Sequence, residues 1–331
     1  MNASPVIPRF GNGAVRIRQR DLWAFLVAMA CAVTYTALPL EIFPDRPNYL
    51  AYAADRSSIL FQFYREQGTT ALIFNEPLWL GLNMVLSQHL APETIVRIII
   101  FVPAFIVYFL GARKTGLWAL AFVAISIHPV FSTNHLHHLR FALALSIFAI
   151  GVLSNRTDVR VACLIAPGFI HVSFMVFALM YVISAAPLVF RQSRMMMLTV
   201  IFIAGAAFLI VLPMIGEAAR QVERYHDREV SVGGGMFLAM GIIFAVFICQ
   251  SRTFLRDHHF AVTALGFYLA LYWIFPYSRR FLDAAILFVL IAGFCLPPRS
   301  RTVFLAVLGG LLLIFLNDRA AEPYLGMARY I

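Results

Sequence analysis

The chain has 331 residues, of which 61% are hydrophobic and 13% are charged, and its mean hydropathy is +0.82. Apolar runs of roughly 15 to 20 residues recur from end to end, the length that a helix needs to cross a bilayer core of about 30 Å. The polar stretches between them are too short for a soluble domain with its own core. We therefore expect a single all-α polytopic membrane domain over residues 1–331. The net charge of +10 is a signal of topology and does not indicate nucleic-acid binding.

The first span is expected over about residues 22–40. The basic stretch before it enters an apolar run that is too long for a signal-peptide core, so the span is expected to stay uncleaved. Residues 41–70 mix charged and aromatic side chains, which suits an outer loop with a helix in the plane of the membrane interface. The four cysteines lie inside apolar segments without CxxC spacing, which favours buried thiols over disulfides or metal ligands.

Two segments are expected to be irregular. Residues 71–90 are apolar but carry Asn75, Glu76 and Pro77, and we expect a partial helix because lipid-facing spans do not carry such residues. Residues 161–190 are long for one span and short for two, which predicts a helical hairpin broken near His171. Together with these, about 9 to 11 transmembrane helices are expected. The other spans are expected over about residues 95–112, 116–131, 140–153, 195–215, 236–250, 260–275, 281–296 and 302–316.

Residues 216–235 form the second long polar stretch. Acidic and arginine side chains alternate in it at three- and four-residue spacings, and it ends in consecutive glycines. This pattern predicts a solvated surface helix with ion pairs, followed by a flexible hinge. We expect an outer loop that is able to serve as a mobile lid.

Charge sets the orientation of the spans. If residues 71–90 do not cross and the 161–190 hairpin begins and ends on the cytoplasmic side, the cytoplasmic loops hold 14 basic and 3 acidic residues, or +11. Of the 26 basic and 16 acidic residues in the chain, 12 and 13 then remain on the outer side, or −1. This split follows the positive-inside rule, so we adopt that topology.

Arginines begin two helices that run inward from the outer face in this topology. Arg140 begins one of them, and Arg279 with Arg280 begins the other. Unpaired backbone N–H groups together with an arginine form a site for anions, phosphate above all. The alternative for Arg140 is that its long side chain snorkels to the interface. We favour an anion site because Arg280 repeats the setting of Arg140.

The candidate bases lie on the same face. Asp45 and Glu76 are flanked by prolines in FPDRPNY and FNEPLW, and a carboxylate of suitable pKa can act as general base on a hydroxyl. Asp45 is equally explained as a solvated turn residue or a helix cap, whereas Glu76 stands among apolar residues. His171, in the expected helix break, contacts either a substrate or another helix.

A group of histidines precedes Arg140. His135, His137 and His138 form an H-x-H-H motif in a short loop, and no acidic ligand lies nearby in the sequence. Metal sites need more convergent ligands than this motif supplies. We therefore expect an exposed polar loop and no metal site.

A series of residues runs through the chain in a defined order: Asp45 with Tyr49, Glu76, Ser126-Ile127-His128-Pro129, Leu139-Arg140 with Ala144, His171 with Ser173, and the late arginines 279 and 280. This order resembles the EpsG-like branch of the Wzy-type polysaccharide polymerases, over roughly residues 20–300. Where that family often reads I-R-Q-G-L-A, this chain reads L-R-F-A-L-A at 139–144, so a substrate contact from position 141 is not carried over.

The resemblance implies an enzyme that joins oligosaccharide repeat units carried on undecaprenyl diphosphate into a surface polysaccharide, an exopolysaccharide or O-antigen. The reaction is then placed at the periplasmic face of a bacterial inner membrane, with no cofactor. The implied partners are the lipid-linked oligosaccharide, the lipid bilayer and other polysaccharide assembly proteins. The candidate catalytic residues are Asp45, Glu76 and His171. The candidate substrate-binding residues are Tyr49, His128, Arg140, Ser173, Arg279 and Arg280.

Two other functions stay open. The first outer loop also looks like that of GT-C glycosyltransferases, which place an acidic residue after the first span. A GT-C-like transferase would add one sugar from a polyprenyl-phosphate donor. A flippase or transporter for a lipid-linked saccharide would use the same arginines for binding without chemistry. Loss of a polymerase leaves single repeat units on the outer face, whereas loss of a flippase leaves them inside.

Overall fold

The computed structural model describes residues 13–128, 131–132, 136–185, 198–199, 201–203, 205–207, 234–275 and 278–319. Every regular element in these ranges is helical, so the all-α prediction is confirmed for this part of the chain. Most of the predicted span at 195–215, the predicted outer loop at 216–235 except its last two glycines, and His135 lie outside the described residues.

The helices include three short 3₁₀ segments, η1, η3 and η4, and one π-helical turn, η2. In chain order, the elements are α1 (Gly13–Ala37), η1 (Leu40–Ile42), α2 (Arg46–Ala51), η2 (Tyr52–Arg56), α3 (Ser57–Glu66), α4 (Thr69–Phe74), α5 (Pro77–Ser87), α6 (Pro92–Thr115), η3 (Gly116–Trp118), α7 (Ala119–Ser126), α9 (Leu139–Leu153), α10 (Thr157–Ile165), η4 (Ala166–Phe169), α11 (Ser173–Ala185), α15 (Gly234–Ile248), α16 (Arg252–Asp257), α17 (His259–Leu271), α18 (Arg279–Phe294) and α19 (Pro298–Arg319).

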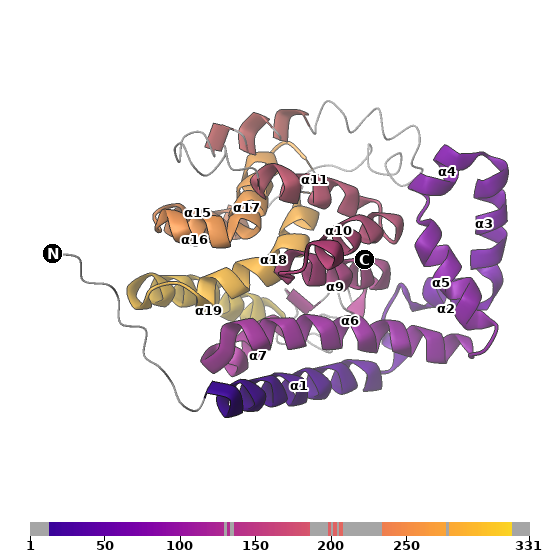
Figure 1. Cartoon of the computed structure of the whole chain (residues 1–331), viewed down its shortest axis with the longest axis horizontal. Coiled ribbons are helices and arrows are strands. Elements are labelled where there is room, and N and C mark those ends of the chain that lie inside the picture. The colour runs from indigo at the N-terminus through magenta and orange to yellow at the C-terminus, as the bar shows by residue number, and fades with distance from the viewer. Residues whose placement is uncertain are drawn as a thin grey trace.

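Helices α1 and α6 lie side by side and run antiparallel (Figure 1). At one end of the pair, the Arg20 guanidinium donates to the backbone carbonyls of Arg113 and Lys114 at the end of α6. At the other end, Arg97 donates to the carbonyl of Thr36 near the end of α1. These bonds satisfy carbonyls that helix ends leave without intrahelical partners.

At the end of the molecule where Arg20 meets the end of α6, cationic side chains from distant parts of the chain lie close together. Lys114 lies close enough to Cys295, after α18, and to His258, before α17, for its charge to act on both. Arg160 of α10 acts in the same way on His259. We term this the basic end. Its described cations include Arg20, Arg113, Lys114, Arg160 and Arg301.

The segment from α2 to α5 lies at the opposite end of the molecule (Figure 1). It leaves the end of α1 and returns to the start of α6, which lie at the same end. Helix α5 has 11 residues, which span about 16 Å, so it does not return to the basic end. The expected partial helix at 71–90 is present as α4 and α5, which are separated at Asn75 and Glu76.

The predicted break near His171 is confirmed. Helix α10 passes into the 3₁₀ segment η4, and α11 begins at Ser173. Both arms return to the basic end, because Ser184 Oγ lies 2.7 Å from Nδ1 of His259 while Arg160 lies near the same ring. Proline and glycine in the sequence Ala-Pro-Gly explain why the helix does not continue.

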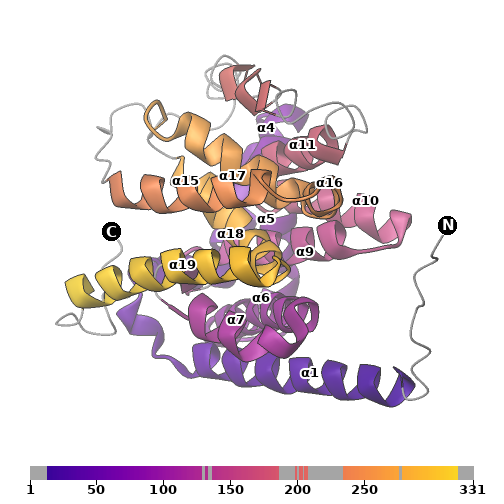
Figure 2. The ribbon, with the colours of Figure 1, turned by 90° about the vertical axis from the view of Figure 1, so that its left-hand side faces the viewer.

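The core is built around α18, whose residues from Ala284 to Phe294 are all buried. A helix that is apolar on every side is typical of the centre of a bundle. Figure 2 shows the other helices stacked around it, with α1 at one edge and α15 and α17 towards the opposite edge. Glycines allow the closest approaches between neighbouring helices. A methyl group at Gly111 would overlap the ring of Phe122, and one at Gly293 would overlap the ring of Phe304.

Two helical stretches in the described part are long and apolar enough to cross a bilayer, Pro92–Ser126 and Pro298–Asn317, and five shorter apolar helices accompany them. The first stretch is not one continuous rod. Gly116, with φ 62°, ends α6, and α7 turns back so that Phe122 packs on Gly111. The predicted span at 116–131 is therefore shorter than expected, since α7 ends at Ser126.

Candidate functional site

Polar side chains from five elements converge at the end of the molecule opposite the basic end. They come from the starts of α2, α5, α9 and α18 and from the break between η4 and α11. We term this group the polar site. Four of the five positions are helix N-termini, and the partial positive charge of a helix N-terminus favours anions.

An ion pair between Arg140 and Glu76 lies at the centre of the polar site. Nη1 of Arg140 contacts Oε2 of Glu76, whose side chain is 3% exposed, and the Arg140 side chain is 25% exposed. Both residues were predicted to lie on one face, but their pairing was not predicted. The pair explains how a carboxylate is tolerated among apolar residues, because a buried charge needs a partner.

Glu76 also has an unusual backbone conformation. Its φ is 60° and its ψ is 53°, which makes it the single non-glycine residue with positive φ in the described ranges. A left-handed conformation of this kind costs on the order of 1–3 kcal/mol. It separates α4 from α5, and Pro77 then begins α5. The strain coincides with the buried carboxylate, as is common at functional sites.

Aromatic rings form one wall of the polar site. The Arg140 guanidinium lies over the ring of Tyr52, 5.6 Å from its centroid. Trp79 presents its ring edge-to-face to Tyr49 at 5.9 Å and to Tyr52 at 6.0 Å. Tyr52 begins the π-helical turn η2, a feature that occurs often at functional sites. Neither Tyr52 nor Trp79 was singled out from the sequence.

Asp45 lies beside the ion pair and is more accessible. Its carboxylate Oδ2 is 3.6 Å from Nδ1 of His138, and its side chain is 44% exposed. The contact with His138 holds the pKa of the Asp45 carboxyl below its ordinary value, and the nearby charge of Arg140 acts in the same direction. Asp45 precedes α2 as its N-cap but makes no side-chain capping bond, so its carboxylate is directed to the polar site rather than to its own helix.

Arg46, which sequence analysis did not single out, is almost completely enclosed. Its side chain is 1% exposed, it donates from Nη2 to the carbonyl of Leu136, and it lies 4.8 Å from the Phe43 ring centroid. The expected exposed histidine loop is wrong for His137, which is 1% exposed and packs edge-to-face on Phe43. Because Arg46 and Phe43 hold the chain at 136–137 inward, this stretch is part of the core.

His171 is buried within the break between η4 and α11. Its Nδ1 lies 2.8 Å from Oγ of Ser173, so the two residues of the predicted pair are joined. The ring packs edge-to-face on Phe141 at 5.6 Å. Arg140 and Arg280 are close enough for their charges to act on His171. The structure therefore connects the break to the starts of both α9 and α18.

Two residues that were predicted to bind substrate, Arg279 and His128, interact with other parts of the molecule. Arg279 begins α18 beside Arg280, as predicted, but its charge acts on Tyr268 and Tyr272 of the α17 end. His128 is buried with its ring 5.2 Å from that of Phe315 in α19. The structure thus brings together Asp45, Tyr49, Glu76, Arg140, His171, Ser173 and Arg280.

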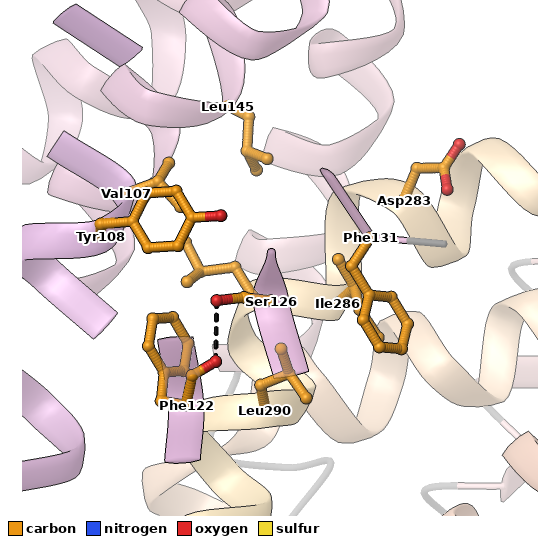
Figure 3. Close-up of a pocket in the computed structure, with 10 residues that line it drawn as sticks. Val107, Tyr108, Phe122, Ser126, Phe131, Leu145, Asp283, Ile286 and Leu290 are labelled. Atoms are coloured by element: carbon orange, nitrogen blue, oxygen red, sulfur yellow. Dashed lines mark hydrogen bonds between the residues drawn. The ribbon is translucent and has the colours of Figure 1, made fainter. Parts of the chain in front are cut away.

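A small cavity lies deeper, between α6, α7, α9 and α18. Its volume is about 20 Å³, enough for one water molecule and too small for a sugar. Figure 3 shows the hydroxyls of Tyr108 and Ser126 on one side of it and the Asp283 carboxylate on the other. The Tyr108 hydroxyl is also 2.6 Å from that of Tyr35. Neither Arg140 nor Glu76 lines this cavity.

The described residues contain no group of three or more histidine, cysteine, aspartate or glutamate side chains arranged to hold a metal ion. A scan against protein-family models gives no match. Searches of curated proteins and of solved structures give no match either.

Proposed function

We propose that the chain is an integral membrane glycosyltransferase that polymerises oligosaccharide repeat units carried on undecaprenyl diphosphate. The observation that carries the proposal is the convergence of Arg140 and Arg280 with Asp45 and Glu76 at one end of the helical bundle. Cations suit the diphosphate of the donor, and carboxylates suit the hydroxyl of the acceptor. The order of these residues in the sequence resembles that of the EpsG-like polymerases.

Surface chemistry supports placement in a bilayer with the polar site on the periplasmic face. Large apolar side chains are exposed along α1 and α19, among them Trp23, Leu313 and Ile314. Contiguous exposed apolar surface is costly in water and favourable in lipid. The basic end collects arginines and a lysine, and cytoplasmic loops of membrane proteins carry that excess. We therefore propose that the chain crosses an inner membrane several times, with the polar site outward.

The geometry supports distinct roles for the two carboxylates. Glu76 balances the charge of Arg140, whereas Asp45 is partly exposed and can meet an acceptor hydroxyl. In the proposed step, the acceptor oxygen attacks the anomeric carbon of the donor and its proton passes to Asp45. The bond from that carbon to the diphosphate breaks, and the diphosphate leaves with the electron pair. Arg140 and Arg280 stabilise the negative charge of the leaving group.

Incubation of the purified protein with lipid-linked repeat units, followed by sizing of the product, tests the proposal. We expect wild type to form chains of many units and Asp45→Asn to lose at least about 100-fold in rate, since general bases contribute about 10²–10⁴-fold. Asp55→Asn is the matched control, because Asp55 is exposed ten positions further along the same outer segment. Full-length polymer from Asp45→Asn would contradict the role of Asp45.

The product also distinguishes the alternative functions. Addition of a single sugar from a polyprenyl-phosphate donor would indicate a GT-C-type transferase in place of a polymerase. Movement of lipid-linked saccharide across vesicles without new glycosidic bonds would indicate a flippase. Either result would overturn the proposed polymerisation.

A further inference from the structure

Arg46 is the most enclosed arginine among the described residues, with 1% of its side chain exposed. Its Nη2 donates to the Leu136 carbonyl, but Nε and Nη1 are buried and have no hydrogen-bond partner. Burial lowers the pKa of Arg46 to about 10, which leaves the guanidinium charged at neutral pH. A buried charge with unpartnered donors is among the most costly arrangements in a folded protein.

The carboxylate of Asp45, which is adjacent in sequence, acts on Arg46 through its charge but contacts His138. Glu76 pairs with Arg140. The ring of Phe43 contributes only a weak cation–π contact at 4.8 Å. An anion is therefore the component that would complete the environment of Arg46.

Arg46 and Arg140 belong to one cluster of side chains, because Tyr49 and Tyr52 follow Arg46 at three-residue spacing along α2 and η2, and the Arg140 guanidinium lies 5.6 Å from the Tyr52 ring centroid. The charges of both arginines act on the buried Tyr49 phenol, and Tyr49 lies three residues after Arg46 on the same face of α2. Arg140 is partly exposed, so we expect a ligand to approach from its side. Two guanidinium groups in one cluster of side chains match two linked phosphates better than they match one.

We propose that Arg46 binds the second phosphate of a diphosphate whose first phosphate is bound by Arg140. The proposal rests on the proposed function for the choice of a lipid-linked diphosphate as the ligand. A phosphate oxygen at Arg46 would occupy donors that are now unpartnered, and charge-assisted bonds of this kind are about twice as strong as neutral ones. Arg46 thereby distinguishes a diphosphate headgroup from a monophosphate.

Binding measurements with two prenyl lipids test this selectivity. The affinity of the purified protein in detergent is measured for farnesyl diphosphate and for farnesyl monophosphate. We expect wild type to bind the diphosphate at least about tenfold more tightly. Arg46→Gln should remove most of that preference and leave monophosphate affinity within about twofold, whereas Arg140→Gln should weaken both. Arg65→Gln, an exposed arginine of the same outer segment, should change neither.

Equal affinity of wild type for the two lipids would overturn the assignment, and this comparison needs no variant to fold. Equal weakening of both lipids by Arg46→Gln would also overturn it, because that is the result of a purely structural role through Leu136. Arg46→Lys keeps the charge, and retention of the diphosphate preference in this variant supports binding by charge.

The affinity for inorganic pyrophosphate shows whether the diphosphate at Arg46 is a free ion or a lipid headgroup. Binding as tight as that of farnesyl diphosphate supports a free diphosphate at Arg46, and weaker binding supports a lipid headgroup. A protein that keeps the diphosphate preference but forms no polymer would overturn the proposed polymerase and leave the assignment of Arg46 standing.

Discussion

The Arg140–Glu76 pair has the least exposed carboxylate of the ion pairs in the described residues. Removal of one partner leaves the other charge enclosed, which costs about 3–5 kcal/mol in buried pairs. We therefore expect Glu76→Gln and Arg140→Met each to lower the thermal unfolding temperature strongly, and the double variant to recover much of the loss. Thermal unfolding in detergent gives the unfolding temperatures of the wild type and of the three variants.

The exposed pair between Arg156 and Asp158 is the control for the single and double variants of Glu76 and Arg140. Asp158→Asn should leave the unfolding temperature almost unchanged, because solvent screens an exposed pair. Additive losses from Glu76→Gln and Arg140→Met would contradict the pairing.

The charge of Asp45 makes the stability of the folded state depend on pH, and the direction of this dependence is defined. Its folded pKa is lowered, chiefly by His138, so its ionised form stabilises the folded state above the ordinary pKa of about 3.9. That stability is lost as the pH falls through the folded pKa. We expect wild type to be more stable than Asp45→Asn at pH 7 by less than about 1 kcal/mol, since the side chain is partly exposed.

Thermal unfolding of both proteins from pH 7 down to pH 3 measures this difference. The two curves should converge towards the acid end. A constant difference over that range would show that Asp45 acts through packing and not through its charge.

Residues were predictable where a polar side chain interrupts an apolar run. Glu76, Arg140 and His171 stand out on that ground, and all three meet in the polar site. Arg46 did not stand out, because an arginine in a charged loop looks solvated in the sequence. Its burial depends on Phe43 and Leu136, and Leu136 is ninety positions away.

At the scale of elements, helix breaks were predictable because proline and polar residues disfavour a continuous span. The breaks at Glu76 and before Ser173 follow from this. The return of α7 onto α6 was not predictable, since it depends on the fit of the Phe122 ring over Gly111. The π-helical turn at Tyr52 also has no sequence signal of its own.

The contact between α6 and α7 gives a prediction at this scale. Gly111→Ala would force its methyl group against the Phe122 ring and should destabilise the protein by about 1–3 kcal/mol. Phe122→Leu in the same chain should restore part of that stability, because the side chain is smaller and more adaptable. Chemical or thermal unfolding in detergent measures both.

Gly241→Ala in α15 is the control, since no atom lies within 4 Å of the added methyl group. It should be neutral or slightly stabilising, because alanine favours helix over glycine. An equal loss in Gly111→Ala and Gly241→Ala would show that the helix backbone, and not the Phe122 contact, is responsible.

For the whole molecule, the sequence predicts two chemically different ends because charge is distributed unevenly among the loops. The structure has such ends, with Lys114 near His258 and Arg160 near His259 at one of them and the Arg140–Glu76 pair at the other. Which helices are neighbours was not predictable. The α1–α6 pairing depends on contacts such as that of Arg20 with the carbonyls at the end of α6.

The proposed membrane topology places these two ends on opposite sides of a bilayer. In a chain whose cysteines are replaced by alanine, Asp55→Cys introduces an exposed thiol near the polar site and Arg299→Cys introduces one at the start of α19, at the basic end. A membrane-impermeant maleimide should label only Asp55→Cys in spheroplasts, and both after permeabilisation. Labelling of both in intact spheroplasts would contradict the topology. Labelling of Arg299→Cys alone would invert it, which would place the Arg140–Glu76 pair on the cytoplasmic face, where a periplasmic polymerase could not use it.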